Sequence, residues 1–251
     1  MRRVLPLRLW CRLAEDCPCP PPAVIEIRDL RYRWPRASTD CIDVDCLDVE
    51  TGHAVFLHGP SGCGKSTLLG LLAGVLVPSS GRVAVLGQDW SALSAARRDA
   101  QRADHIGYIF QQFNLLPYLN VIDNVALPCR FSALRAQRAT AQHGQIDAAA
   151  EHLLASVELP RDRWHAGAGE LSVGQQQRVA AARALIGQPE LVIADEPTSA
   201  LDAALRDGFM DMLLAACRHA GSTLVFVSHD ERLAERFDTR LSLPALNRVA
   251  S

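Results

Sequence analysis

Two stretches near the start of the chain alternate apolar residues with acidic ones. They cover residues 24–27 and 42–46, and the second continues into residues 47–49. Strict alternation places the apolar side chains on one face of a strand, which is typical of antiparallel strands with one face in water. The pattern therefore predicts a half-buried antiparallel β region.

Further along the chain, apolar residues run together instead of alternating. Such runs cover residues 53–58, 105–110, 191–194 and 223–227. Short continuous runs of this kind predict strands that are covered on both faces, as in a parallel sheet. We therefore expect a mostly parallel sheet at the centre of the molecule.

Segments of helical type lie between these predicted strands. Residues 68–76 are predicted to form a buried helix and residues 91–101 a surface helix. Between residues 118 and about 168 strand formers are scarce, and Pro128 and Gly144 are expected to separate several helices. A strong helix is predicted at 176–185, and one short amphipathic helix is expected within residues 231–251. The fold predicted is α/β, with a mostly parallel sheet, an antiparallel β subdomain and an inserted α-helical subdomain at about residues 112–186.

The link between the run at 53–58 and the following helix carries the most specific chemistry. It reads Gly59, Pro60, Ser61, Gly62, Cys63, Gly64, Lys65, Ser66 and Thr67, which matches G-x-x-x-x-G-K-[ST] at every fixed position. Glycines at 59, 62 and 64 let backbone N–H groups point inward at phosphate oxygens, and the helix start adds its positive dipole end. Lys65 brings a compact positive charge to the terminal phosphates, and the Ser66 hydroxyl is placed to bind magnesium. The loop predicts a triphosphate site in a P-loop NTPase core.

Polar residues follow three of the predicted strands, at the sheet edge where ligands bind in open α/β folds. Asp195 and Glu196 follow one strand, and two adjacent carboxylates there need a cationic partner. Magnesium held by Asp195 from its outer shell supplies one, which leaves Glu196 to orient and deprotonate an attacking water. His229 follows another strand and can donate a hydrogen bond to the terminal phosphate. Gln111 follows a third, but it is uninformative by itself.

Two other segments admit both a functional and a structural interpretation. Tyr32 and Trp34 stand upstream of the phosphate loop, where an aromatic ring can stack on a nucleotide base or simply cover the sheet edge. Ser172 and Gly174 precede the strong helix, where they can bind an anion or only cap the helix. The residues alone leave both questions open.

Composition and charge narrow the classes of function. The 251 residues are 49% hydrophobic and 22% charged, as in an ordinary globular protein. The net charge of −2, from 26 basic and 28 acidic residues, gives no electrostatic basis for nucleic acid as the main partner. The eight cysteines lack zinc-ligand spacing and are expected to be reduced thiols of a cytosolic protein. No apolar run approaches the roughly 18 residues that a membrane span needs.

The first 22 residues differ from the rest of the chain. They open with two arginines and then leucines, like a signal peptide, but Pro6, Arg8 and Arg12 interrupt any apolar segment. The prolines at 18 and 20–22 then prevent a helix. We expect residues 1–22 to be a poorly ordered extension and residues 23–251 to form a single domain.

Taken in order, these segments resemble the ATP-binding subunit of ABC transporters over about residues 24–243. The motifs that carry the resemblance are the phosphate loop, the Q-loop glutamine Gln111, the signature at 171–175, the pair Asp195 and Glu196, the D-loop at 199–202 and the switch histidine His229. The resemblance implies that the chain binds and hydrolyses ATP with Mg²⁺. It assigns the metal to Ser66, Gln111 and Asp195, and catalysis to Glu196, His229, Gln111 and Lys65. By position, Trp34 looks like the adenine-stacking aromatic, with Tyr32 as the alternative.

The same resemblance implies that each site is shared between two subunits. In the family, the signature closes the phosphate site of a partner, so Ser172, Gly174 and Gln175 would contact the nucleotide of a second copy. Separate transmembrane permease subunits are the other implied partners, and no nucleic acid is expected. The implied location is peripheral, on the cytoplasmic face of the plasma (inner) membrane.

The loop after Gln111 and one departure from the family pattern refine this expectation. Residues 110–117 and 121–125 are similar to the group of macrolide-exporter, lipoprotein-release and cell-division ATPases, although importer ATPases carry near variants. We expect an exporter or lipoprotein-release type; an importer, or a regulatory ATPase that signals without transport, is the alternative. Val173 stands where the signature usually has glycine, and a backbone with positive φ there would cost about 1–2 kcal/mol.

Overall fold

The computed structural model describes residues 23–199 and 203–249. The predicted N-terminal extension, residues 1–22, lies outside the described residues. So do residues 200–202 of the predicted D-loop, of which only Ser199 is described.

The alternating segments form a four-stranded antiparallel sheet. Its strands, in spatial order, are β2 (Ile42–Glu50), β1 (Ala23–Tyr32), β4 (Ser80–Val85) and β5 (Gln88–Asp89). The register pairs Ile27 with Leu47, so apolar residues of β1 and β2 share the buried face. The charged residues face outward, where Arg28 Nη1 lies 2.6 Å from Asp48 Oδ1. The predicted segments 42–46 and 47–49 form one continuous strand.

The continuous apolar runs form a parallel sheet, as predicted. Its strands, in spatial order, are β6 (Ile106–Ile109), β7 (Leu191–Asp195), β8 (Thr223–Val227), β3 (Ala54–His58) and β9 (Thr239–Ser242). Strand β9 corrects the expectation of one amphipathic helix and a tail in residues 231–251. That region forms the 3₁₀ helix η5 (Glu231–Arg236), then β9, then the short helix α9 (Leu243–Leu246). The four residues of β9 carry only one buried apolar side chain, Leu241, so this strand depends on pairing with β3.

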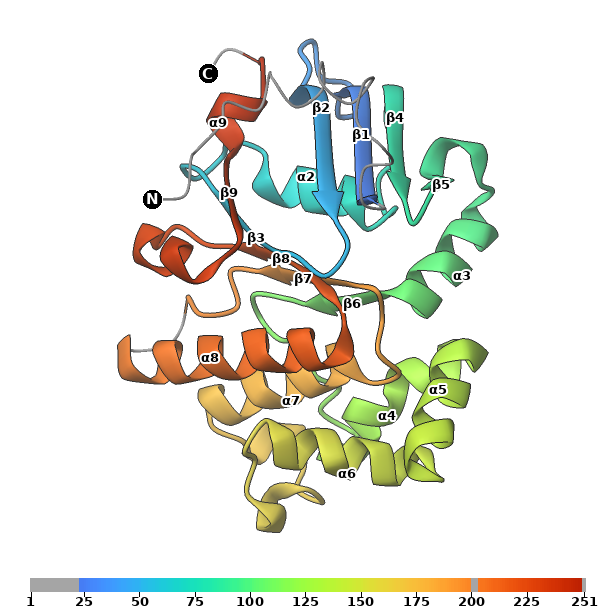
Figure 1. Cartoon of the computed structure of the whole chain (residues 1–251), viewed down its shortest axis with the longest axis vertical. Coiled ribbons are helices and arrows are strands. Elements are labelled where there is room, and N and C mark those ends of the chain that lie inside the picture. Colours follow the sequence, from blue (N-terminus) through green and yellow to red (C-terminus); the bar gives the residue numbers. More distant parts are fainter. Residues whose placement is uncertain (1–22, 200–202, 250–251) are drawn as a thin grey trace, which may run out of the picture.

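The two sheets enclose a helix and form the upper half of the molecule in Figure 1. Helix α2 (Lys65–Leu72) lies between them, and its leucines join both sheets in one hydrophobic core. Helix α3 (Ala95–His105) starts later than predicted, because Ser94 caps it and the short 3₁₀ helix η2 (Trp90–Ala92) precedes it. Helix α2 is therefore held between the antiparallel sheet and the parallel sheet.

Helices form the lower half of the molecule in Figure 1, on the other side of the parallel sheet. They are α4 (Val121–Phe131), α5 (Ala133–His143), α6 (Ile146–Ser156), α7 (Val173–Leu185) and α8 (Ala203–Ala220), with the 3₁₀ turns η3 (Arg161–Arg163) and η4 (Ala168–Glu170) before α7. Helices α7 and α8 pack on the sheet, whereas α4, α5, α6 and α7 share a separate core. Gly144 ends α5 with a φ of 78°, as predicted, but Pro128 lies inside α4 and separates nothing.

One buried arginine joins this helical part to the parallel sheet. The guanidinium of Arg135 on α5 donates hydrogen bonds to the carbonyl oxygens of Ile186 (2.7 Å), Ala184 (2.6 Å) and Ile106. Burial lowers the pKa of Arg135 to about 10, so the group stays cationic at neutral pH. A β-carbon on Gly107 would lie 2.2 Å from the Ala184 oxygen, so only glycine lets α7 approach β6 this closely.

Most of the described cysteines are free thiols. Cys41, Cys63, Cys129 and Cys217 are free. Cys46 is disulfide-bonded, so the expectation of reduced thiols is wrong at that position.

Candidate active site

The carboxyl ends of the parallel strands bring three predicted segments to one edge of the sheet. Strand β3 leads into the phosphate loop, β7 ends at Asp195 beside Glu196, and β8 leads to His229. Strand β8 pairs with both β7 and β3, so these segments follow neighbouring strands. A backbone hydrogen bond of 3.1 Å from the Glu196 N–H to the Val227 carbonyl fastens the end of β7 to β8.

The three glycines of the phosphate loop are required for two different reasons. Gly62 and Gly64 have φ values of 82° and 100°, a conformation that favours glycine. The φ of Gly59 is not positive, but a β-carbon there would lie 2.7 Å from the Cys63 sulfur. Gly59 thus provides space, whereas Gly62 and Gly64 provide the turn that directs the chain into α2.

Lys65 connects the phosphate loop to the strand that carries the carboxylates. Its Nζ donates to the carbonyl oxygens of Gly59 (2.9 Å) and Pro60 (3.0 Å) and lies 3.8 Å from Glu196 Oε1. The side chain is only 9% exposed. Lys65 and Glu196, which are 131 positions apart in the sequence, thereby form one charged group at the sheet edge.

Asp195 is paired with the residue predicted to share a metal with it. The Ser66 hydroxyl lies near the Asp195 carboxylate. Burial raises the pKa of Asp195, and the Glu196 charge raises it further, while the Ser66 hydroxyl and Lys65 lower it. A cation beside these oxygens would stabilise the charged carboxylate.

This donor set fits magnesium. Mg²⁺ prefers hard oxygen ligands and usually takes only one or two from protein, completing its shell with phosphate oxygens and water. Ser66 and Asp195 offer such oxygens next to the phosphate loop. Within residues 23–199 and 203–249 there is no group of three or more His, Cys, Asp and Glu side chains that could hold a metal without such help.

Glu196 and His229 face each other across the ends of β7 and β8. His229 Nδ1 lies 3.4 Å from Glu196 Oε2, while the other carboxylate oxygen faces Lys65. Glu196 has a left-handed backbone with a φ of 44°, which is uncommon for a residue other than glycine. Strain of this kind persists only where the surroundings hold it, and here the bond to Val227 does so.

Gln111 lies near this group without a direct bond to it. It follows β6, whose last residue, Ile109, pairs with Ala194 beside Asp195. Its side chain is exposed and makes no hydrogen bond with the phosphate loop, Asp195 or Glu196 in the part of the chain that the structure describes. The predicted role of Gln111 at the metal therefore rests on position alone.

Sequence reasoning missed Arg183, which holds the turn after Gln111. From α7 its guanidinium donates to the carbonyl oxygens of Phe113 (2.5 Å) and Asn114 (2.7 Å). Both of these residues have positive φ, 59° and 47°. Arg183 is nearly buried, and burial lowers its pKa. The only signal in the sequence is a basic residue among the alanines of the second half of a buried helix.

The signature segment belongs to the helical part and not to the phosphate site of its own chain. Ser172 caps α7: its Oγ accepts from the Gln175 N–H, and the Gln175 side chain accepts from the Ser172 N–H. Among the described residues, no hydrogen bond joins Ser172, Gly174 or Gln175 to the phosphate loop. The capping interpretation of Ser172 is thus confirmed; the cap uses the Gln175 N–H, and those of Val173 and Gly174 make no hydrogen bond to a described residue.

Val173 is accommodated without the strain considered above. It is the first residue of α7, it is exposed, and its φ is not positive. The backbone here needs no glycine, so the departure from the usual signature carries no conformational cost.

The two candidate aromatic residues differ sharply in exposure. Trp34 is 45% exposed and Tyr32 is 7% exposed, with their rings in edge-to-face contact at 5.2 Å between centroids. A hydrogen bond from the Cys41 N–H to the Tyr32 carbonyl closes the loop that carries Trp34, and the Cys41 sulfur lies 3.7 Å from Thr67 Oγ1. This loop therefore stands beside the phosphate loop, with Trp34 as the accessible ring.

Thiol modification of Cys63 is expected to block nucleotide binding. Cys63 is free, partly exposed and next to Gly59, so an added group would crowd the loop that is predicted to bind phosphates. We expect N-ethylmaleimide to abolish ATP hydrolysis, and ATP added beforehand to protect the protein. Cys63→Ala is the control and should lose the sensitivity; inhibition that persists in this variant would assign the effect to another thiol, with Cys41 the nearest.

Comparison with known proteins identifies the family of the chain. Residues 43–199 match the sequence model of the family described as ABC transporter. The uncharacterized ABC transporter ATP-binding protein YbbA of Escherichia coli (strain K12) is 42% identical over 78% of this chain and 83% of its own length. The lipoprotein-releasing system ATP-binding protein LolD of Novosphingobium aromaticivorans is 40% identical over 86% and 93%. The spermidine/putrescine import ATP-binding protein PotA of Nitrosomonas europaea is 40% identical over 84% and 55%.

A solved structure with the same fold adds a nucleotide-bound example. The ATP-binding cassette MJ0796, in a dimeric post-hydrolysis state bound to ADP and Pi, matches 87% of this chain and 93% of its own. The TM-score is 0.74 and the sequence identity is 30%. The chain belongs to the ABC transporter family, as one of its ATP-hydrolysing, ATP-binding subunits.

Proposed function

We propose that two copies of this chain bind two ATP molecules between them and use their hydrolysis to drive a membrane transporter. The observation that carries this proposal is the charged group of Lys65, Glu196 and His229 beside the phosphate loop. Within the described part of the chain, no hydrogen bond or ion pair joins the signature at the start of α7 to that loop. A second copy that presents its α7 start would supply the missing N–H donors, which are suited to phosphate.

The proposed roles follow from the contacts within the site. Lys65 and the loop N–H groups bind the terminal phosphates, while Trp34 stacks on the base. Glu196 orients the water that attacks the γ-phosphorus and accepts its proton, as the bond to the bridging oxygen breaks. The contact with His229 orients the Glu196 carboxylate. Magnesium at Ser66 and Asp195, with Gln111 nearby, would neutralise charge on the phosphates.

A groove beside the Gln111 turn is suited to a helix of the membrane partner. It has a volume of about 470 Å³ and is lined by residues that include Phe110, Phe131, Arg135 and Arg183. Phe110 and Phe131 are exposed large apolar side chains, which are common at protein interfaces. No helix among the described residues is long and apolar enough to cross a membrane, so the partner would supply the spans.

Among transport systems, we favour an exporter or lipoprotein-release type. The similarity to LolD over nearly the full length of both proteins supports this choice. PotA, a protein named for import, is equally identical but is covered over only 55% of its length. An importer remains the second candidate, and transport assays of the co-purified partner separate the two.

Replacing Phe131 by aspartate is expected to weaken the association with the membrane partner. A charged group in an apolar groove has to be desolvated when a helix binds there. We expect several-fold less of the chain in native membranes, with ATP hydrolysis by the isolated chain unchanged. The control is Val75→Asp, an exposed apolar residue that does not line the groove. Equal recovery of both variants with membranes would contradict this docking site.

A further inference from the structure

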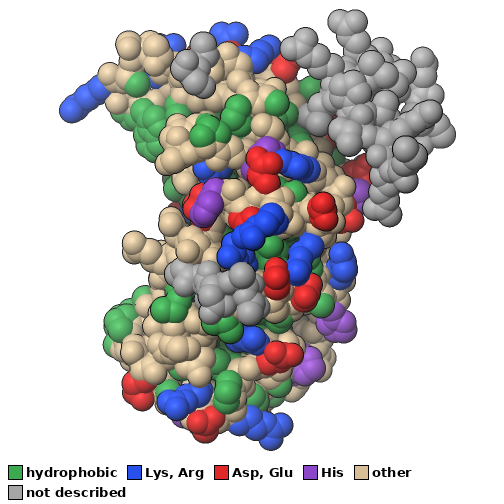
Figure 2. All heavy atoms as spheres, turned by 90° about the vertical axis from the view of Figure 1, so that its left-hand side faces the viewer, with side chains coloured by type: hydrophobic (Ala, Val, Ile, Leu, Met, Phe, Trp, Pro, Cys, Tyr) green, Lys and Arg blue, Asp and Glu red, His purple; other side chains and the backbone are tan. Residues whose placement is uncertain are grey.

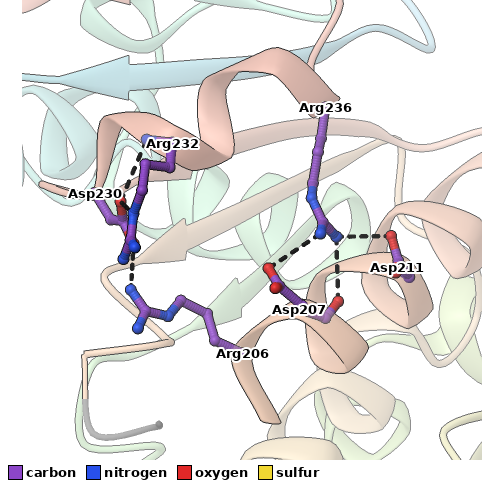
Figure 3. Close-up of polar contacts among 6 residues, drawn as sticks. All are labelled: Arg206, Asp207, Asp211, Asp230, Arg232 and Arg236. Atoms are coloured by element: carbon purple, nitrogen blue, oxygen red, sulfur yellow. Dashed lines mark hydrogen bonds and ion pairs between the residues drawn. The ribbon is translucent and has the colours of Figure 1, made fainter. Parts of the chain in front are cut away.

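Two groups of ion pairs tie the start of α8 to η5, directly after His229 (Figure 3). In one, Arg206 and Arg232 both reach the carboxylate of Asp230. In the other, Arg236 reaches Asp207 and Asp211 of α8, at 3.0 and 2.7 Å. The start of α8 and η5 lie on the left of Figure 1, the side that faces the viewer in Figure 2, where basic and acidic side chains lie close together in the middle of the molecule. Both groups fasten the same two elements, but only the first includes a neighbour of His229.

The pair of Arg206 and Asp230 is the most enclosed of these ion pairs, whereas Arg232 is largely in water. The side chains of Asp230 and Arg206 are 11% and 18% exposed, whereas those of Asp207 and Asp211 are largely in water. The hydrogen bond from Arg232 and the charges of both arginines hold the pKa of Asp230 at about 2, so its carboxylate stays charged. Screening by water is weak for such a pair and strong for the exposed one.

Asp230 is fixed on all sides by the chain that surrounds His229. Its N–H donates to Ser228 Oγ at 3.1 Å, and its Oδ1 accepts from the Arg232 N–H at the start of η5. Among the described side chains of α8, Arg206 is the one that forms an ion pair with Asp230. The ion pair with Arg206 thereby holds the residue next to His229 against α8, while Arg236 and the apolar side chains of η5 hold the residues further along.

We propose that Arg206 is a positioning residue for His229 and acts through Asp230. The His229 side chain is exposed, so packing does not fix the 3.4 Å approach of its Nδ1 to Glu196; the backbone beneath it must do so. Arg206 holds that backbone, and it comes from the helix that begins directly after the expected D-loop. This inference rests on the proposed role of His229 in ATP hydrolysis.

The test compares ATP hydrolysis by Arg206→Gln and Arg236→Gln. Each variant removes one cationic partner between α8 and η5, so a purely structural role predicts similar losses in both. We expect Arg206→Gln to lower kcat about 10- to 100-fold, since small displacements of reacting groups have effects of this size. The KM for ATP should change less than about threefold, because the phosphate loop is untouched. Arg236→Gln should keep kcat within about twofold.

A second pair of variants keeps the test decisive. Arg206→Lys retains the charge opposite Asp230 and should recover at least half of the activity lost in Arg206→Gln, with thermal melting as the check on folding. If the two glutamine variants have equal kcat, or if folded Arg206→Lys stays as slow as Arg206→Gln, the inference is wrong. His229→Ala separates the two proposals: normal hydrolysis by this variant would overturn the role of His229 itself.

Discussion

Lys65→Ala is expected to lose nearly all ATP hydrolysis. The Nζ group is the one side-chain cation held against both the phosphate loop carbonyls and Glu196 within the described site. Its removal leaves the terminal phosphates without a preorganised charge, an effect of about 100- to 1,000-fold in kcat/KM. Phosphate release and equilibrium dialysis with ATP measure the two consequences, turnover and binding.

Chemical labelling of lysine provides an independent test of the role of Lys65. Lys65 is the only lysine among the 251 residues, so an amine-reactive reagent has a single lysine side chain to label. ATP should protect it from labelling. Arg28→Ala is the matched control, because it removes a basic side chain from the outer face of the antiparallel sheet. Unchanged phosphate release in Lys65→Ala would overturn the proposed phosphate site.

Glu196→Gln is expected to bind ATP, form a stable dimer and turn over about 100- to 1,000-fold more slowly. Glutamine keeps the size of the side chain but cannot accept the proton of the attacking water. Without hydrolysis, ATP should hold the two copies together. Size-exclusion chromatography with ATP and magnesium detects the dimer, and phosphate release gives the rate.

Glu235→Gln is the control for this second variant. It removes the same charge from an exposed residue of η5, and it should behave as the unaltered protein does. A Glu196→Gln protein that stays monomeric with ATP and hydrolyses it normally would contradict both the catalytic role and the shared site.

The parallel strands and the phosphate loop were predictable because local sequence determines them. Runs such as 223–227 are too apolar for any exposed position, and Gly62 and Gly64 are needed for backbone angles that other residues rarely adopt. Since all the strands of that sheet are parallel, their ends meet at one edge, which brings Glu196, His229 and Lys65 together as expected.

The features that were missed depend on contacts between distant segments. Strand β9 has too few apolar residues to be recognised, and it forms because β3 offers an open edge. Pro128 was expected to end a helix, yet α4 continues through it, since tertiary packing of its apolar face outweighs one missing backbone hydrogen bond. Gly59 was expected to let backbone N–H groups point inward, yet its φ is not positive; a β-carbon there would instead crowd the Cys63 sulfur at 2.7 Å.

The bonds from Arg183 have a mechanical consequence. Two charge-assisted hydrogen bonds, each worth about 1.5–3 kcal/mol, tie the turn after Gln111 to α7. The start of α7 at Ser172 lies eleven residues away, about 16 Å along a stiff helix. A displacement of the turn after Gln111 is therefore expected to move the opposite end of α7 with it, because the helix between them is stiff.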